Sequence, residues 1–280
     1  MSDTMKFETA AIRTQMDVTP EKEHSSPLYL TSSFIFDDAE EMRASFAGEK
    51  QRNIYSRFSN PNATEFIDKL VVMEGAEAGF PSATGMAAIF STFAALTNHG
   101  DHIISCKSIF GSTHSVLTKV LSKWDIGTSY VDLNDTDNWD KAVQKNSKIL
   151  YLETPTNPGL DIIDLEWAGN FAKEHGLILV VDNCFATPYL QQPIKYGADL
   201  VIHSATKFID GQGRVMAGAV VGKASLVEEI YQFCRATGPA ISPFNAWVLS
   251  KSLETLALRM DRHCENALAL AKGLEQHRLV

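Results

Sequence analysis

One lysine in the sequence has the surroundings of an amine nucleophile. Lys207 ends the tetrapeptide Ser204-Ala-Thr-Lys, directly after the strand-like run 199–203. Ligands of open α/β sheets bind at the carboxyl ends of strands, and a lysine placed there among hydroxyls suits nucleophilic chemistry. The tetrapeptide alone is more typical of a surface loop. It also matches a serine acyl-enzyme motif, but the Ser-Asp-Asn and Lys-Thr-Gly elements which that motif requires do not follow it.

A carboxylate ends a second apolar run. Asp182 directly follows the run 177–181, so we expect it at the same edge of the sheet as Lys207. An aspartate in this place is also common as a cap of the following loop. A carboxylate that holds a protonated ring nitrogen, together with a lysine that forms a Schiff base, is the arrangement of a pyridoxal phosphate (PLP) site.

Two further segments have features that suit other parts of such a cofactor. Gly85 and Met86 begin a predicted helix at 85–96, and a helix N-terminus with a glycine attracts phosphate. Asn157 stands between two prolines after the predicted strand 149–152, where its amide would be held rigidly and could donate to a ring oxygen. Tight helix packing and an Asn-Pro turn are the plain alternatives. Agreement among the four segments favours one site at one sheet edge.

The elements that position these residues alternate between short apolar runs and helical patterns. Runs that are apolar on both faces and separated by helices indicate a parallel sheet covered by helices, so we predict an α/β fold with a mostly parallel, mixed sheet. The predicted strands are 102–106, 127–131, 149–152, 177–181, 200–203 and 215–221. The predicted helices are one from Pro61 onward, 85–96, one through 116–121, 137–143, 165–174 and the last forty residues.

Composition limits the class of protein further. The 280 residues carry a net charge of −9 and are 45% hydrophobic, which is typical of a globular domain and argues against a nucleic-acid binder. The four cysteines stand apart with no Cys-x-x-Cys pair, so we expect reduced thiols and no zinc finger. His99 and His102 flank Gly100, which favours a polar turn, and we expect no metal site. We also expect no membrane segment and a cytoplasmic location, because no leader or long apolar run occurs.

Residues 1–60 differ in pattern from the rest of the chain. They hold short apolar runs and polar clusters, with a helical turn near 37–46, and we predict an extended arm that docks on a neighbouring subunit. A disordered tail is the alternative, but the aromatic residues of this segment argue against it. We expect residues 61–250 to form the large cofactor-binding domain and residues 251–280 a linking helix.

The motifs together resemble the Cys/Met-metabolism family of fold-type-I PLP enzymes, from about Thr9 to the end of the chain. The motifs are Tyr55-Ser-Arg57, Ala83-Thr-Gly-Met-Ala-Ala88, Glu153-Thr-Pro-Thr-Asn-Pro158, Val180-Val-Asp-Asn183 and His203-Ser-Ala-Thr-Lys207. The resemblance implies that Lys207 binds the cofactor covalently, that Asp182 pairs with its ring nitrogen, and that phosphate is held by Gly85, Met86, Ser204 and Thr206. It also implies that Tyr55 and Arg57 reach the phosphate of the neighbouring subunit, which requires a homodimer, usually paired into a homotetramer.

Two departures from the family pattern bear on the activity. Where most relatives have a tyrosine that stacks on the cofactor ring, this chain has Phe110, which stacks but transfers no proton. With a phenylalanine at this position the chain resembles the O-succinylhomoserine sulfhydrylases. The resemblance implies conversion of O-succinylhomoserine and sulfide to homocysteine and succinate. Cystathionine γ-synthase, an O-acetylhomoserine sulfhydrylase and a non-catalytic PLP-binding remnant remain alternatives. Family members also run about a hundred residues longer, so we expect a missing C-terminal subdomain, with the arginine that binds the substrate carboxylate.

Overall fold

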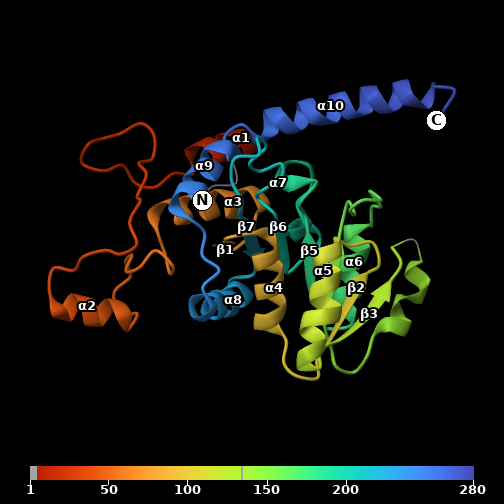
Figure 1. Ribbon diagram of the computed structural model, residues 1–280, viewed down its shortest axis with the longest axis horizontal. Helices are drawn as coiled ribbons and strands as arrows, with labels where there is room; N and C mark the ends of the chain where they lie inside the picture. The colour runs from red at the N-terminus through yellow and green to blue at the C-terminus, as the bar shows by residue number, and fades with distance from the viewer. Residues whose placement is uncertain (1–4, 134) are drawn as a thin grey trace.

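A seven-stranded sheet runs through the computed structural model, which describes residues 5–133 and 135–280 (Figure 1). The strand order is β1-β7-β6-β5-β4-β2-β3. The strands are β1 (Ala78–Ser82), β2 (His102–Cys106), β3 (Gly127–Val131), β4 (Ser147–Glu153), β5 (Ile178–Asp182), β6 (Leu200–His203) and β7 (Gly218–Gly222). From β6 to β3 all neighbours pair in parallel, and β7 alone runs against both of its neighbours. The predicted α/β fold with a mostly parallel, mixed sheet is confirmed.

The predicted strands lie inside the sheet, except β3, which forms one edge. Every residue of β2, β6 and β7 is buried, as are the last five residues of β4. Burial on both faces explains why their sequences are mostly apolar. The edge strand β1 was not predicted, because Ala78-Gly-Phe-Pro-Ser lacks such a run; proline is tolerated in it because β1 pairs only with β7.

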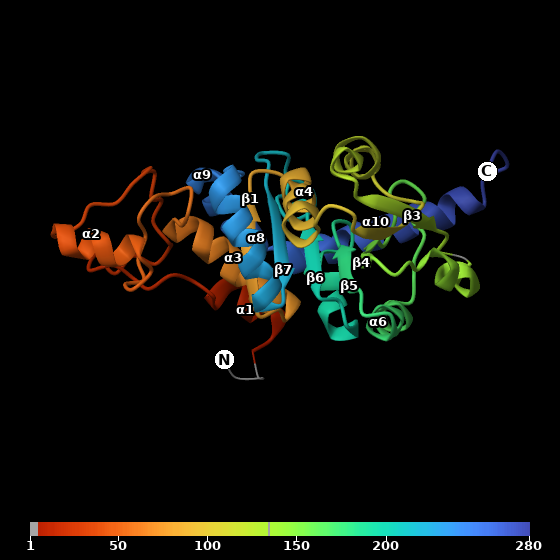
Figure 2. The same ribbon diagram turned by 90° about the horizontal axis from the view of Figure 1, so that it is seen from below.

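Helices cover both faces of this sheet. On β1, Gly79 faces Ile67 of α3 (Pro61–Glu74), and the next residue, Phe80, packs on Tyr231 of α8 (Ala224–Thr237). Because successive strand residues point to opposite faces, α3 and α8 lie on opposite sides. Figure 2 shows α4 (Gly85–Leu96) and α6 (Leu165–Glu174) on opposite sides in the same way. The remaining helices are α1 (Phe7–Arg13), α2 (Ala39–Phe46), α5 (Gly111–Ser115), α7 (Thr187–Leu190), α9 (Pro243–Leu253) and α10 (Leu256–Glu275).

Local signals set both ends of α3 and the start of α4. The side chain of Asn60 caps α3, Pro61 occupies its first turn, and Gly75 ends it with a φ of 72°. The hydroxyl of Thr84 caps α4 by accepting a hydrogen bond from the amide of Ala87 at 3.0 Å.

Several predicted helices differ in type or extent from those observed. The helix expected through 116–121 is a short α5 followed by a π-helix (Val116–Val120) and a 3-10 helix (Leu121–Trp124). The helix expected at 137–143 is a 3-10 helix, Thr136–Ala142. The final forty residues hold two helices, α9 and α10, separated at Glu254 and Thr255. The sequence pattern gave no prediction of α8 or α1.

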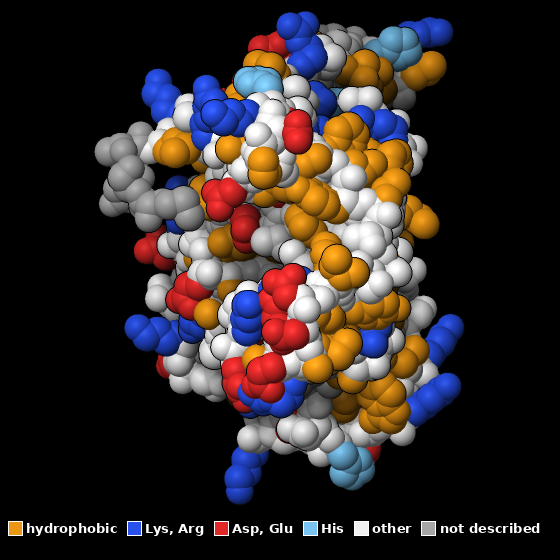
Figure 3. Space-filling view, turned by 90° about the vertical axis from the view of Figure 1, so that its left-hand side faces the viewer, with side chains coloured by type: hydrophobic (Ala, Val, Ile, Leu, Met, Phe, Trp, Pro, Cys, Tyr) orange, Lys and Arg blue, Asp and Glu red, His pale blue; other side chains and the backbone are white. Residues whose placement is uncertain are grey.

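The N-terminal arm lies outside the sheet domain for much of its length. Figure 1 shows α2 far from the sheet, joined to it by long connections on either side. Several apolar side chains of the arm are exposed: Ile35 by 89%, Leu30 by 67% and Phe46 by 51%. Figure 3 views the molecule from the side on which α2 lies and shows hydrophobic side chains spread over this face. None of the described helices is both long and apolar enough to span a membrane.

Candidate active site

Three parallel strands bring charged residues to one edge of the sheet. Asp182 is the last residue of β5 and pairs in register with Glu153, the last residue of β4. Lys207 follows the neighbouring strand β6 after one turn, in which its amide donates to the carbonyl of Ser204 at 3.1 Å. The carboxyl ends of these strands therefore hold the predicted amine and the predicted carboxylate at adjacent positions.

A glycine-dependent cradle lies where phosphate was expected. A Cβ on Gly85 would stand 2.7 Å from Cβ and 2.9 Å from Oγ of Ser204, so only glycine lets α4 begin this close to the loop before Lys207. A Cβ on Gly218 would likewise stand 2.1 Å from the carbonyl oxygen of Thr84. The structure thus places the first amides of α4 beside the Ser204 hydroxyl, an arrangement that fits a phosphate group.

The hydroxyl of Thr206 is already engaged. It donates to the carbonyl oxygen of Ala217 at 3.2 Å and accepts from the amide of the same residue at 3.1 Å. Its single proton is therefore used within the chain, and only an oxygen lone pair remains free. The expected contact of Thr206 with phosphate stays a prediction; the observed bonds fix the Lys207 turn against the residue before β7.

Asp182 is a buried carboxylate with two donors. Its Oδ2 accepts from the hydroxyl of Tyr151 at 3.1 Å and its Oδ1 from the amide of Cys184 at 3.1 Å. Burial raises the pKa of Asp182 above its ordinary value, although these two hydrogen bonds and nearby His203 act in the opposite direction. A cation beside it would stabilise the charged form. The protonated ring nitrogen of PLP is such a cation, so the site fits the cofactor.

Glu153 is a site residue for which sequence analysis expected no role of its own. Its Oε2 accepts a hydrogen bond from the amide of Phe110 at 2.8 Å. Burial and the neighbouring Asp182 raise its pKa to about 7, against backbone hydrogen bonds from Phe110 and Asn157. It therefore ties together the two loops that carry the predicted stacking ring and amide donor. Its place at the end of a buried apolar run, like that of Asp182, was the signal that could have found it.

The remaining predicted residues of the site surround this edge with differing exposure. Phe110 immediately precedes α5 and is 42% exposed. Met86 contacts the hydroxyl of Thr113 in α5, with 4.0 Å between Sδ and Oγ1, and Asn157 is half-buried. Lys207 is exposed. The single chain therefore leaves the candidate site open to solvent on the side of Lys207.

Tyr55 and Arg57 contact parts of the chain other than the loop of Lys207. The guanidinium of Arg57 donates to the backbone oxygen of Arg235 and stands 4.7 Å from the ring centre of Phe58 and 5.4 Å from that of Tyr55. These contacts join Arg57 to the C-terminal end of α8 and to two aromatic rings of the arm. One chain by itself thus does not bring these two residues into contact with Lys207.

The sheet order and this set of side chains define a class, the PLP-dependent enzymes built on a mixed, mostly parallel sheet. A family model described as Cys/Met metabolism PLP-dependent enzyme matches residues 8–280, and the chain belongs to that family.

Relatives of known description support this assignment. An O-succinylhomoserine sulfhydrylase of Pseudomonas aeruginosa is 45% identical over 96% of this chain and 67% of its own length. An L-methionine gamma-lyase of Porphyromonas gingivalis is 40% identical over 90% of this chain and 64% of its own length. The chain thus spans about two thirds of the length of these curated relatives.

Solved structures agree in fold. The crystal structure of metB from Corynebacterium glutamicum superposes with a TM-score of 0.93 at 34% identity, covering 99% of this chain and 70% of that one. An O-acetylhomoserine (thiol)-lyase of Campylobacter jejuni gives a TM-score of 0.93 at 29% identity, covering 98% and 77%. Its structure carries a pyridoxyl-lysine phosphate.

Proposed function

We propose that this chain carries the PLP-binding part of an O-succinylhomoserine sulfhydrylase, which converts O-succinylhomoserine and sulfide to homocysteine and succinate. The observation that carries the proposal is Phe110, a partly exposed ring without a hydroxyl at the candidate site. The backbone amide of Phe110 donates a hydrogen bond to the side chain of Glu153, which holds the ring in place. The similarity to the sulfhydrylase of Pseudomonas aeruginosa supports the same activity.

The proposed roles of the residues follow from their positions. When bound, PLP supplies an electron sink that stabilises a carbanion at Cα of the substrate. Lys207 holds the cofactor and moves protons at Cα and Cβ of the substrate. Asp182 keeps its charge opposite the ring nitrogen, and the amides of Gly85 and Met86 with the Ser204 hydroxyl hold the phosphate. Succinate leaves from Cγ and sulfide takes its place, so a carbon–oxygen bond is replaced by a carbon–sulfur bond.

Phe110 bears on the choice between replacement and elimination. A tyrosine hydroxyl in this place can transfer protons, whereas the phenyl ring offers only a stacking surface. Proton transfer in the site then rests on Lys207. An enzyme with fewer proton donors near the substrate favours capture by sulfide over the elimination carried out by a lyase.

A competition assay tests this proposal. The PLP-loaded protein is given O-succinylhomoserine with equal sulfide and cysteine, and products are identified by mass spectrometry. Homocysteine in excess supports the sulfhydrylase, and cystathionine in excess identifies a cystathionine γ-synthase instead. Faster turnover when O-acetylhomoserine replaces O-succinylhomoserine would reassign the acyl group. Release of methanethiol when methionine is the substrate would indicate a γ-lyase. Bound PLP without turnover of any of these substrates would favour the non-catalytic remnant.

We further propose that a second copy of the chain completes the site. The exposed apolar arm supports this, as does the position of Tyr55 and Arg57 away from Lys207. Mixing an Arg57→Ala variant with a Lys207→Ala variant should restore part of the activity, because one active site of the mixed dimer then holds both intact residues. Failure of mixed subunits to regain any activity would contradict the shared site. The homotetramer and the cytoplasmic location stay predictions.

A further inference from the structure

A buried carboxylate lies beneath the candidate site without taking part in the roles above. Glu74 is the last residue of α3, and its side chain has no exposed surface. Its Oε1 is 2.6 Å from Nε2 of His203 and accepts a hydrogen bond from Nδ2 of Asn183 at 3.0 Å. Both partners are themselves fully buried. A single oxygen atom thus binds the ends of two neighbouring strands, β5 and β6.

The hydrogen bonds continue to a third strand through Gln191. Asn183 donates from Nδ2 to the carbonyl oxygen of Gln191 at 2.8 Å, and its Oδ1 accepts from Nε2 of Gln191 at 2.9 Å. The same Nε2 donates to the carbonyl oxygen of Thr154 at 2.9 Å. Thr154 follows the last residue of β4, so the network reaches the ends of β4, β5 and β6.

Each strand-end residue of the network is the direct neighbour of a site residue. Thr154 follows Glu153, Asn183 follows Asp182, and His203 precedes Ser204. A displacement of the network would therefore move the carboxylates and the Lys207 turn relative to one another.

The network is costly for stability, which argues that packing alone does not account for it. Glu74 places a carboxylate at the C-terminal end of a helix, where the helix dipole disfavours negative charge. Among the described residues, its Oε2 and Nδ1 of His203 are buried without hydrogen-bond partners. Buried polar atoms without partners destabilise a fold, and apolar residues of similar volume often replace a buried polar pair without loss. Such violations are expected where a site needs fixed geometry.

We propose that Glu74 is a positioning residue for the cofactor site. By holding His203 and Asn183, it sets the spacing between the ends of β5 and β6, and thereby between Asp182 and Lys207. The inference rests on the proposed function, because the group whose orientation depends on this spacing is PLP. Glu74 touches neither cofactor nor substrate; it acts through its two partners.

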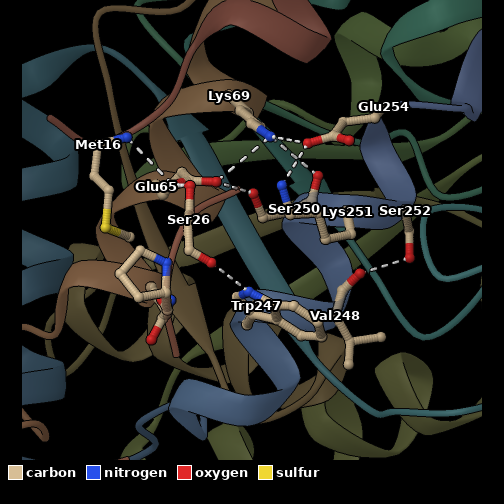
Figure 4. Close-up of polar contacts among 12 residues, drawn as sticks. Met16, Ser26, Glu65, Lys69, Trp247, Val248, Ser250, Lys251, Ser252 and Glu254 are labelled. Atoms are coloured by element: carbon tan, nitrogen blue, oxygen red, sulfur yellow. Dashed lines mark hydrogen bonds and ion pairs between the residues drawn. The ribbon is translucent and has the colours of Figure 1, made fainter. Parts of the chain in front are cut away.

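The same helix provides a matched control, shown in Figure 4. Glu65 is also buried in α3, where it accepts from the hydroxyl of Ser250 at 2.6 Å and the amide of Met16 at 3.2 Å, and lies 3.5 Å from Lys69. Its Oε2 also accepts from the hydroxyl of Ser26. This cluster links α3 to α9 and to Met16 and Ser26 of the arm, not to the strand ends. A substitution of Glu65 disturbs a buried charge in α3 but leaves the strand ends untouched.

The experiment compares Glu74→Met, Glu74→Gln and Glu65→Gln in the PLP-loaded protein. Circular dichroism in the absorption band of bound PLP reports its fixed orientation, a fluorescence titration gives its Kd, and thermal denaturation of the cofactor-free protein gives stability. We expect Glu74→Met to lose most of the dichroic signal and to raise the Kd about ten-fold, the effect of one charge-assisted hydrogen bond. Its Tm should stay equal or rise. Glu74→Gln keeps an acceptor oxygen and should retain the signal.

The outcomes separate this inference from the proposed function. Glu65→Gln should lower Tm and leave the dichroic signal of bound PLP unchanged. If Glu74→Met lowers Tm while the Kd and the dichroic signal stay at parent values, Glu74 is only structural and the inference is wrong. Should that variant fail to fold, Gln191→Leu tests the link from β5 to β4 at a half-buried position, and an unchanged signal there overturns the inference. Absence of any PLP band in the parent protein would instead refute the proposed function.

Discussion

Replacing Gly85 with alanine should damage the phosphate cradle in a way that can be worked out from the backbone. The new methyl carbon would stand 2.7 Å from Cβ and 3.0 Å from Cα of Ser204, whereas ordinary contacts begin at 3.4 Å. It must therefore retreat by about 0.7 Å. Neither neighbouring atom is the end of a flexible side chain, so the start of α4 or the turn before Lys207 has to move.

Two effects of this substitution oppose each other. Alanine favours a helix over glycine by about 1 kcal/mol in the interior, and less in the first turn. Overpacking costs about 1–3 kcal/mol, so we expect a net loss of stability of the order of 1 kcal/mol. The displacement also weakens the hydrogen bonds from the first amides of α4 to phosphate, and one hydrogen bond to a charged group contributes about 1.5–3 kcal/mol. The Kd for PLP should therefore rise by between about ten- and 100-fold.

Gly111→Ala is the matched control for this prediction. Gly111 also begins a helix near the site, α5, but a Cβ there would meet no atom within 4 Å. That variant should keep the parent Kd and gain slightly in Tm. Titration of both cofactor-free variants with PLP, followed by visible absorbance, measures the difference. Equal affinity for PLP in Gly85→Ala and the parent would refute the reasoning that close approach to Ser204 builds the cradle.

Three further predictions concern residues of the candidate site. Lys207→Ala should abolish both turnover and the absorbance of covalently held PLP, and an unchanged visible band would contradict the assignment of Lys207. Phe110→Tyr should keep PLP binding and raise the share of elimination products in a mass-spectrometric assay; an unchanged product ratio would reduce Phe110 to a packing residue. The pKa of Glu153 is raised from its ordinary value of 4.5 to about 7, so the folded state binds this proton more tightly than the unfolded chain does. Stability from this group is then fully present below about pH 4.5 and is lost as the pH rises through about 7, by roughly 3 kcal/mol. Glu153→Gln should accordingly gain in unfolding free energy over the cofactor-free parent between pH 5 and pH 8 in urea titrations, and a constant difference across that range would disprove the shift.

The sequence identified those parts of the fold that depend on local patterns. The strands 102–106, 127–131 and 200–203 and the helices 85–96 and 165–174 were predicted with the observed bounds, because each combines strand-forming residues or a helical period with clear end signals. β1 was missed because its pairing with β7, rather than its own residues, makes it a strand. The segment 116–121 was predicted as part of one helix, but helix type depends on hydrogen bonds that a periodic pattern does not specify.

The same division holds for the site. Residue types and spacing sufficed to propose Lys207, Asp182 and Gly85, because segments that are each ambiguous alone agree on one cofactor at one edge of the sheet. The involvement of Glu74 could not be read in this way, since it is separated from His203 by 129 residues and meets it only when α3 packs under the sheet. The hydrogen bonds of Thr206 with Ala217 and of Arg57 with Arg235 could likewise not be predicted from the sequence.

What the sequence by itself determined is the class of chemistry and the sheet that supports it. Both follow from short segments whose local physics is independent of the rest of the chain. Only the tertiary structure decided how the strand ends are held, which hydroxyls remain free, and that Glu153 shares a buried edge with Asp182. These properties depend on burial and on contacts between distant segments, and burial is set by the packing of the whole chain.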